Sequence, residues 1–329
     1  MKIFIIGSNS FMGSSLINYI SKNHNIEFEL RGCSRSVEKK KNFNLYKNIK
    51  DNNFKYYRID LNKNMDQLIK VLKEFKPKII YNFAAQSIVE HSWVKPEDWF
   101  NTNLISNIKL LDYLKNVTYL EKYIHSSTPE VYGSINYKIL ENFNYRPSTP
   151  YASSKASIDM LLKNYFDNYG LPVVFTRVSN IYGPGQQLFK IIPKTIISIM
   201  QNKKIPLHGN GLSKRSFIYS DDVSAAMLKM KEQSINGEIY HVTNEKMYSI
   251  KTVVKNICNV MNKDFERSVI MENERPGKDH IYNLSSKKIK KLDWNSKISL
   301  LKGIVTTKEW IQKDYLSLKN IKLRYSHQK

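Results

Sequence analysis

Short runs of apolar residues alternate with longer amphipathic segments through the first half of the chain. The runs are rich in Ile, Val, Phe and Tyr, as buried parallel strands are. They predict strands at 2–6, about 28–33, 54–59, 79–83, 122–126 and 173–177. The segments between them predict helices at about 12–22, 65–75, 98–115 and 151–168. This alternation is typical of an α/β fold with a Rossmann-type, doubly wound parallel sheet.

From about residue 180 the pattern becomes rich in loops, and prolines interrupt it at positions 184, 193, 206 and 276. A run at 237–243 nevertheless predicts one further strand. We therefore expect a Rossmann domain over 1–179 that also receives about 216–248. A smaller, C-terminal substrate-binding domain would take 180–329, so that the two domains are interleaved along the chain.

Polar or small residues recur where each predicted strand ends. In strand order they are Gly7, Arg35, Asp60, the segment 84–86 (AAQ), Thr128 and Asn180. The carboxyl ends of parallel strands meet at one edge of the sheet, and ligands of doubly wound folds bind there. The recurrence therefore predicts a binding site at this edge.

The turn after the first strand has the spacing of a phosphate-binding loop, Gly7-x-x-Ser10-x-x-Gly13. Gly7 permits a tight turn, Gly13 permits close packing of helix on strand, and the helix N-terminus faces a pyrophosphate. Ser10 replaces the usual middle glycine and is small enough for a phosphate to approach. The turn predicts a dinucleotide site, although turns of this kind are also found as purely structural features.

Tyr151 and Lys155 are four residues apart in a predicted helix, so they share one face. A phenol is a poor base at neutral pH, and a neighbouring cation lowers its pKa. We therefore expect Lys155 to make Tyr151 a usable proton acceptor. Beside a nicotinamide cofactor, such a pair can oxidise a sugar hydroxyl.

The formal net charge of +23 indicates an anionic partner. The basic residues are spread along the chain and no nucleic-acid module is recognisable, so we expect phosphorylated small molecules and no nucleic acid. Cys33 and Cys258 provide neither a disulfide framework nor a metal site. No apolar stretch is long enough for a membrane span and no signal peptide is recognisable, so the expected location is the cytoplasm, without a membrane partner.

The chain resembles the extended short-chain dehydrogenase/reductases that act on nucleotide-sugars, over roughly residues 1–310. Within them it is most similar to NDP-sugar 4,6-dehydratases of the dTDP-glucose and GDP-mannose types. The segments that carry the resemblance are 82–87 (NFAAQS), 127–133 (STPEVYG), 151–155 (YASSK), 180–184 (NIYGP), 192–193 (IP), 215–221 (RSFIYSD) and 274–279 (ERPGKD). The resemblance implies conversion of a nucleotide-hexose to its 4-keto-6-deoxy derivative, with hydride stored on the cofactor and returned.

The resemblance also implies catalytic roles for Thr128, Glu130, Tyr151 and Lys155. Tyr151 would remove the proton of the 4-hydroxyl group, and Thr128 would hydrogen-bond the same oxygen. Glu130 would then take the proton from the fifth carbon, and water would be lost across the fifth and sixth carbons. A 4-epimerase has no need of that carboxylate, so Glu130 is the residue that distinguishes the two activities.

Pro129 departs from the dTDP-glucose type, in which an aspartate between Thr and Glu protonates the leaving hydroxyl group. GDP-mannose 4,6-dehydratases also lack that aspartate, so dehydration stays open, with Glu130 or a water as the acid. UDP-glucuronate decarboxylases share Thr-x-Glu, but their Arg-x-Pro-Asp element is replaced by Arg275-Pro-Gly. The alternatives are an NDP-sugar 4-epimerase, 4-ketoreductase or decarboxylase, or a non-catalytic binding protein, against which the complete Tyr–Lys pair argues.

The cofactor is expected to be NADP or NAD. No acidic residue follows the second strand, where NAD-binding folds place one, and a cation with hydroxyls at Arg35 suits a 2′-phosphate, so NADP is favoured. Arg35 could instead stack on adenine, which either cofactor allows. The expected cofactor-binding residues are Gly7, Ser10, Phe11, Met12, Gly13, Arg35, Asp60, Leu61, Ala84, Ala85, Gln86, Asn103, Tyr151 and Lys155.

The C-terminal domain is expected to hold the nucleoside diphosphate of the sugar. Arg215 and Arg275 are the expected phosphate clamps, because guanidinium groups match phosphate oxygens. The full set of expected substrate-binding residues is Ser87, Asn180, Lys190, Pro193, His208, Arg215 and Arg275, with no metal ligand among them. The family pairs the helices at about 98–115 and 151–168 with their symmetry mates, so we also expect a homodimer.

Overall fold

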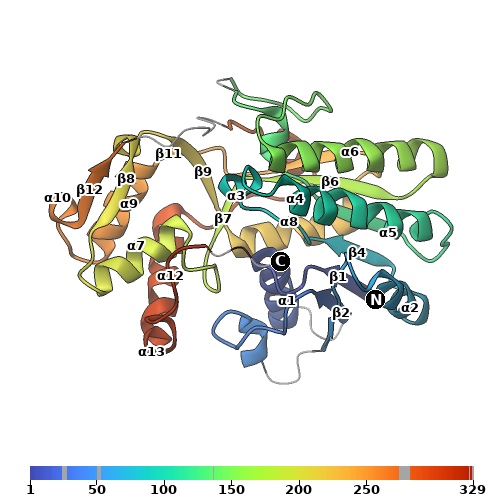
Figure 1. Ribbon diagram of the computed structural model, residues 1–329, viewed down its shortest axis with the longest axis horizontal. Coiled ribbons are helices and arrows are strands. Elements are labelled where there is room, and N and C mark those ends of the chain that lie inside the picture. Colours follow the sequence, from blue (N-terminus) through green and yellow to red (C-terminus); the bar gives the residue numbers. More distant parts are fainter. Residues whose placement is uncertain (24–27, 50–52, 136, 274–281, 326, 328–329) are drawn as a thin grey trace.

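A seven-stranded parallel sheet forms the larger part of the molecule (Figure 1). The structure is a computed structural model, and it describes residues 1–23, 28–49, 53–135, 137–273, 282–325 and 327. The strands lie in the order β10-β6-β5-β4-β1-β2-β3, which confirms the predicted doubly wound sheet. Their bounds are β1 Lys2–Ile6, β2 Glu29–Ser34, β3 Phe54–Arg58, β4 Ile79–Asn82, β5 Lys122–Ser126, β6 Val173–Val178 and β10 Ile239–Val242.

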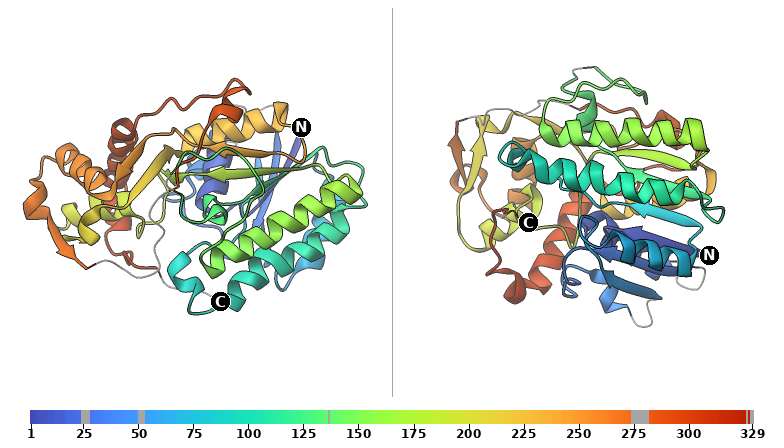
Figure 2. Two further views of the ribbon diagram at one scale, coloured as in Figure 1. Left: turned by 90° about the horizontal axis from the view of Figure 1, so that it is seen from above. Right: turned by 45° about the vertical axis from the view of Figure 1, so that its right-hand side comes forward.

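Helices cover both faces of this sheet (Figure 2). The alternation of side chains along the strands separates two cores. Ile3 and Ile5 of β1 belong to the core beneath α1 (Phe11–Asn23) and α8 (Ser220–Gln233). Their neighbours Phe4 and Ile6 belong to the opposite core, beneath α2 (Met65–Phe75), α5 (Ser106–Leu114) and α6 (Pro150–Tyr169). Both faces are therefore apolar, which explains why the strands appear in the sequence as nearly continuous hydrophobic runs.

The segment predicted as one helix over 98–115 is divided by a π-helical turn. Helix α4 (Pro96–Phe100) continues into the turn η2 (Asn101–Ile105) and then into α5. Such turns shift the side-chain phase and often occur near functional sites. Here the turn contains Asn103, one of the expected cofactor-binding residues.

The smaller part contains two further sheets around a separate core (Figure 1). Strand β9 (Lys214–Tyr219) lies between β7 (Asn180–Tyr182) and β11 (Met247–Ser249), and β8 (Ile205–His208) pairs with β12 (Val269–Glu272). The chain crosses back between β9 and β11, where α8 packs on α1 and β10 joins the edge of the large sheet. The remaining elements are η1 Leu45–Asn48, α3 Val89–Ser92, η3 Pro129–Tyr132, α7 Ile191–Met200, η4 Gly209–Gly211, α9 Ile250–Val260, α10 Phe265–Ser268, α11 Lys287–Lys290, α12 Leu300–Lys313 and α13 Tyr315–Leu318.

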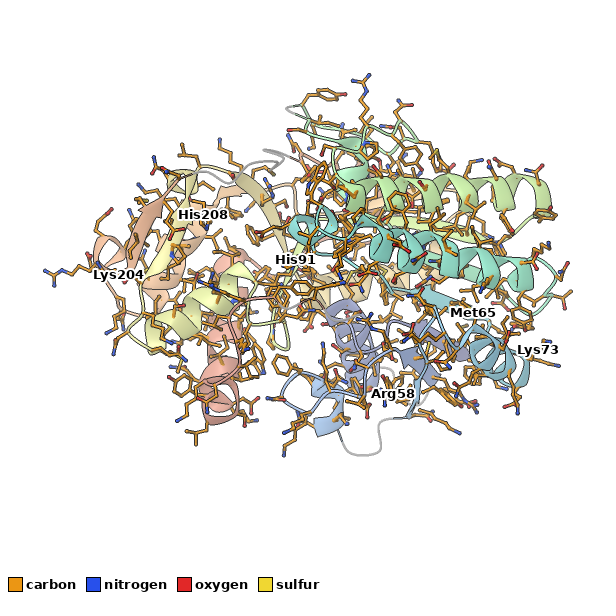
Figure 3. All side chains as sticks on the ribbon, in the orientation of Figure 1. Arg58, Met65, Lys73, His91, Lys204 and His208 are labelled. Carbon is orange, nitrogen blue, oxygen red and sulfur yellow. The ribbon has the colours of Figure 1, made fainter. Side chains whose placement is uncertain are left out.

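The last described residues return to the boundary between the two parts. The His327 Nε2 atom lies 2.8 Å from Asp98 Oδ2, and the imidazole stacks on Trp99 with 5.1 Å between ring centroids. Tyr325 packs edge-on against His91, which Figure 3 places near the middle of the molecule. The C-terminal segment is thus held against α3 and α4. Within the described ranges, no helix is long and apolar enough to cross a membrane.

Candidate active site

The turn after β1 has no room for a side chain at either of its two glycines. Gly7 has a φ of +82°, and a Cβ atom there would lie 2.6 Å from the backbone nitrogen of Ala84. A Cβ atom on Gly13 would lie 2.4 Å from the carbonyl oxygen of Gly7. The first glycine therefore permits the turn and the approach of β4, and the second permits the close packing of α1, as their spacing predicts.

Ser10 has a structural role that the spacing alone does not reveal. Its Oγ atom accepts a hydrogen bond from the Gly13 N–H at 3.1 Å, so it caps the start of α1. The replacement of the usual glycine thus adds a helix cap while keeping a small residue at the phosphate-facing turn. Ser10, Phe11 and Met12 all line the main cavity described below.

Asn9, which sequence reasoning missed, links this turn to the loop after β2. Its side chain donates to Ser36 Oγ and to the Val37 carbonyl, each at 2.8 Å, and accepts from the Lys39 N–H at 3.0 Å. The residue is 4% exposed. The sequence signal for this role is weak, since it consists only of a polar residue between the two glycines of the turn.

The loop after β4 is fixed by Asn103 from the π-helical turn. Asn103 Oδ1 accepts from the Gln86 N–H at 2.8 Å, and Asn103 Nδ2 donates to the Gln86 carbonyl and to Ser154 Oγ. Both the oxygen and the nitrogen of the Asn103 side-chain amide are thus hydrogen-bonded within the protein. Its position supports the loop 84–86, and direct contact of Asn103 with a cofactor stays a prediction.

A second hollow, of about 530 Å³, lies at the ends of β2 and β3. It brings together four of the expected cofactor-binding residues, Arg35, Asp60, Leu61 and Gln86. Asp60 holds its own turn, since its Oδ1 atom accepts from the Asn62 N–H at 2.9 Å. The hollow and the glycine turn are the two places along the sheet edge where the halves of a dinucleotide are expected.

The main cavity, of about 890 Å³, lies between the large sheet and the smaller part. It unites Thr128, Glu130, Tyr151 and Lys155 with residues expected to contact the cofactor or the sugar nucleotide. The latter are Ser10, Phe11, Met12, Ala85, Ser87, Asn180, Lys190, His208 and Arg215. Segments from three different sheets therefore meet in one cavity.

Thr128 is positioned by the 3₁₀ turn that follows β5. It precedes η3, and its hydroxyl oxygen accepts from the Glu130 N–H at 3.3 Å. A hydrogen bond from Thr128 also favours the ionised form of Tyr151. The hydroxyl group thus combines a turn-capping role with contact to the expected base.

Tyr151 lies in the first turn of α6, whose N-terminus is capped by Thr149 through a 3.1 Å hydrogen bond from the Ala152 N–H. The expectation that Lys155 lowers the pKa of Tyr151 is not met. Burial raises the pKa of the phenol, the negative charge of Glu130 raises it further, and the hydrogen bond from Thr128 only partly opposes them. Burial dominates here, and the cation one turn along the helix is turned toward another partner.

That partner is His125 of β5, whose Nε2 atom lies 3.1 Å from Lys155 Nζ. Burial lowers the pKa of Lys155 to about 8, and the negative charge of Asp159 opposes this shift. Burial and the charge of Lys155 hold the pKa of His125 well below its usual value, so the imidazole is neutral. Lys155 therefore changes its charge within a pH range in which enzymes are assayed.

Asp159 joins this pair to a second buried cation. Its Oδ2 atom accepts hydrogen bonds from Ser127 Oγ and from Arg177 Nη2, the latter at 3.2 Å. Both Asp159 and Arg177 are fully buried, and Arg177 also lies 4.2 Å from the centre of the Tyr132 ring. Sequence reasoning named none of His125, Asp159 and Arg177, although Asp159 is four residues after Lys155 and so shares its helix face.

The residues expected to bind the sugar nucleotide divide into three groups. Asn180, Lys190, His208 and Arg215 line the smaller part's side of the cavity, and Ser87 lines it from the loop after β4. Pro193 is buried in the first turn of α7, while the preceding Ile191 and Ile192 line the cavity. Arg275 lies outside the described residues.

His208 is held at the edge of this wall by an acidic neighbour. Its Nδ1 atom lies 3.0 Å from Glu272 Oε2 on the paired strand β12. Figure 3 places His208 in the smaller part, away from His91. Arg215 is half-buried, and its guanidinium group lies 5.4 Å from the centre of the Tyr282 ring.

Comparison with known proteins agrees with this geometry. The family model described as GDP-mannose 4,6 dehydratase matches residues 4–307. Human dTDP-D-glucose 4,6-dehydratase is 34% identical over 252 residues, which are 75% of this chain and 72% of the human protein. A trifunctional UDP-glucose 4,6-dehydratase of Arabidopsis thaliana is 34% identical over 235 residues, 70% of this chain, and the match spans only 35% of that longer enzyme.

Solved structures show the same fold over almost the whole chain. Bacillus anthracis dTDP-glucose 4,6-dehydratase, in complex with NAD, has a TM-score of 0.85 and 29% identity, covering 95% of this chain and 97% of that one. Bacillus cereus UDP-glucuronic acid 4-epimerase, in complex with UDP-glucuronic acid and NAD, has a TM-score of 0.86 and 25% identity, covering 95% and 99%. Dehydratases and epimerases thus share this architecture, and the side chains in the cavity have to distinguish them.

Proposed function

The chain belongs to the GDP-mannose 4,6-dehydratase family, and from this premise we propose that it converts a nucleotide-hexose to its 4-keto-6-deoxy derivative. The observation that carries the proposal is the meeting of Thr128, Glu130 and Tyr151 in one cavity, with Lys155 one helical turn below Tyr151. Beyond hydride transfer, dehydration needs a base for the 4-hydroxyl group and a separate carboxylate for the C5 proton.

The steps assigned to the protein follow from these positions. Tyr151 takes the proton of the 4-hydroxyl group, and Thr128 donates a hydrogen bond that stabilises negative charge on the phenolic oxygen. The resulting 4-keto group acidifies the proton on the fifth carbon, which Glu130 removes. The same carboxylate holds that proton and returns it to the fifth carbon after water has left.

The turn and the second hollow fit a nicotinamide dinucleotide. A side chain at Gly7 or Gly13 would collide with the protein backbone, so both glycines are needed for the tight turn that precedes α1. Ser10, Phe11 and Met12 would face the pyrophosphate, and Arg35, Asp60 and Leu61 the adenosine half. The cofactor, when bound, supplies the acceptor and later the donor of hydride.

The test of the dehydratase proposal is a substrate panel with product masses. Purified protein is incubated with GDP-, dTDP-, UDP- and CDP-hexoses. Loss of water indicates the dehydratase, an unchanged mass with altered stereochemistry indicates an epimerase, and loss of carbon dioxide from a uronate indicates a decarboxylase. With the nucleotide-hexose that the wild type dehydrates, Glu130→Gln should still oxidise the sugar but should no longer exchange the C5 proton with deuterated solvent.

NADP is the proposed cofactor within the NAD(P) class, because Arg35 lines the second hollow. A charge-assisted contact to the 2′-phosphate contributes roughly 1.5–3 kcal/mol, or about tenfold to a hundredfold in affinity. Arg35→Asp should therefore weaken NADP binding much more than NAD binding. Dissociation constants for both cofactors measure this, and a wild-type protein that prefers NAD would disprove the NADP assignment.

A homodimer is proposed from the outer surfaces of η2, α5 and α6. Ile105, Ile108 and Met160 are 45%, 39% and 48% exposed there, while Leu111 and Leu114 of α5 are buried in the core. Exposed aliphatic side chains on neighbouring helices are typical of an interface. Light scattering should give twice the chain mass, and a monomer mass over a wide concentration range would contradict the proposal.

The domain division at about 179, with 216–248 returned to the sheet domain, is proposed on the pairing of β10 with β6. The cytoplasm is the proposed location, which fits two cysteines that are buried and unpaired.

A further inference from the structure

The proposed dehydration needs a proton donor as well as the base Glu130. Hydroxide is a poor leaving group, so the oxygen on the sixth carbon has to be protonated as its bond to carbon breaks. The residue beside Glu130 in the turn η3 is Pro129, whose side chain carries no proton. If Glu130 keeps the C5 proton until water has left, as proposed above, the acid is another group of the cavity or a water.

Most other groups in the described lining of the main cavity are unsuited to this role. Lys155 lies beneath the expected base and is hydrogen-bonded to a histidine on β5. Glu90 is exposed on the loop side, and His208 is paired with a glutamate on the outer strand β12. Arg215 does not give up a proton in proteins. Among the basic groups of the described lining, Lys190 is therefore the one suited to act as an acid.

Lys190 immediately precedes α7 and lines the main cavity together with Glu130. Its ammonium group lies 5.6 Å from the centre of the Phe189 ring. Burial lowers the pKa of Lys190, and the negative charge of Glu130 opposes this shift. The two groups thus line the same cavity, and an ammonium that is partly withdrawn from water gives up its proton more readily than an exposed one.

We propose that Lys190 is the acid that protonates the departing 6-hydroxyl group. The inference rests on the proposed 4,6-dehydration and names the proton donor that Pro129 leaves open. It assigns the base and the acid to opposite walls of the cavity, Glu130 on the turn after β5 and Lys190 at the start of α7.

The step balances as follows. Glu130 takes the C5 proton, and the electron pair of that bond forms the double bond between the fifth and sixth carbons. The bond from the sixth carbon to oxygen breaks with its pair going to oxygen, which receives a proton from the Lys190 ammonium and leaves as water. Lys190 regains a proton from solvent, and Tyr151 releases to solvent the proton that it took from the 4-hydroxyl group.

A competing role for Lys190 is simple binding of the diphosphate. Binding of the diphosphate stabilises every state of the reaction alike. Its loss would therefore raise KM and leave the relative rates of the chemical steps unchanged. The acid role acts only on the breaking of the carbon–oxygen bond. Exchange of the C5 proton, which precedes that bond cleavage, separates the two roles.

The experiment compares wild type with Lys190→Met in deuterated buffer, using the nucleotide-hexose that the wild type dehydrates. C5 deuterium uptake and loss of water are followed in the same samples by mass spectrometry. We expect Lys190→Met to keep C5 exchange and to lose water about 10²–10⁴ times more slowly, the usual contribution of a general acid. Adding Pro129→Asp to Lys190→Met should restore much of the lost rate, since a carboxylic acid would then adjoin Glu130.

Lys194→Met is the matched control, because Lys194 is one turn further along α7 and does not line the described cavity wall. It removes the same charge from the same helix and should lose water at the wild-type rate. Loss of water by Lys190→Met at the wild-type rate, a change in KM alone, or equal loss of exchange and dehydration would each overturn the proposal. Absence of water loss from every hexose with the wild type would instead refute the dehydratase function, before any variant is examined.

Discussion

The floor of the main cavity and its opposite wall are built in different ways. The floor, beneath Tyr151, holds His125, Asp159 and Arg177, which are at most 1% exposed and bonded to one another or to Lys155. The wall on the smaller part is made by Lys190, Arg215 and other side chains that are only half-buried. Charged groups therefore occur in both regions, but the floor withdraws them from water more completely than the wall does.

This difference indicates that the two regions have different functions. A buried ion pair is costly to form, and removing one partner leaves the other uncompensated, so the floor acts as a unit. A half-buried cation keeps much of its hydration and acts nearly alone. We therefore expect changes in the floor to affect hydride transfer and stability together, and changes in the wall to affect mainly substrate binding, with the proposed acid Lys190 as the exception.

The largest effect is expected where the floor meets the substrate, for Tyr151→Phe. A phenyl ring cannot accept the 4-hydroxyl proton, so turnover should fall by about 10²–10⁴-fold, the range for loss of a general base. Cofactor affinity should be retained because the ring stays. Single-turnover rates measure this, with Tyr81→Phe, a fully buried tyrosine outside the described cavity lining, as control. Equal rates in the two variants would contradict the assignment of the base.

Most of the fold was predictable from the sequence because its signals are local. Apolar runs located the strands of the large sheet, and the steric demands of Gly7 and Gly13 explain the spacing of the turn. The π-helical turn at Asn101–Ile105 was not predictable, since its residues fit an ordinary helix and the phase change depends on packing.

The site was predictable only where a motif carries the chemistry. The Tyr–Lys spacing led to Tyr151 as the expected base, but the prediction for its pKa was wrong, because burial and Glu130 act through tertiary structure. The pairing of Lys155 with His125 is likewise a contact between a helix and a strand 30 residues apart. No local pattern encodes such a contact.

A smaller effect, specific to the floor, is expected for Asp159→Asn. The charge of Asp159 raises the pKa of Lys155 toward its value of about 8, so its removal should lower that pKa further. Lys155 then loses its proton at lower pH, and the alkaline limb of the rate profile, expected near pH 8 in the wild type, should move downward. Arg177 would also be left buried without its partner, which costs about 3–5 kcal/mol of unfolding free energy.

Rate profiles from about pH 6 to about pH 10 and urea denaturation test this variant. Ser127→Ala is the matched control, because it removes a hydrogen bond to Asp159 and keeps the carboxylate charge. Its alkaline limb should stay close to that of the wild type. If the alkaline limb of the Asp159→Asn profile stays where it is in the wild type, the charge of Asp159 does not affect catalysis. The proposal that the floor residues act as a unit would then be wrong.

The smallest effect is expected on the wall, for Arg215→Gln. Arg215 is half-buried, and the proposed contact of its guanidinium group with a phosphate would be worth about 1.5–3 kcal/mol, so KM should rise about tenfold to a hundredfold. The value of kcat should change little, because the contact exists before and during the reaction and stabilises both states alike. Lys214→Gln is the matched control, since neighbouring residues of a strand point to opposite faces and Lys214 is exposed. Steady-state kinetics with the productive nucleotide-hexose decide the matter. A fall in kcat comparable to that of Tyr151→Phe would mean that the wall takes part in the chemistry as the floor does, and the division between the two regions would have to be abandoned.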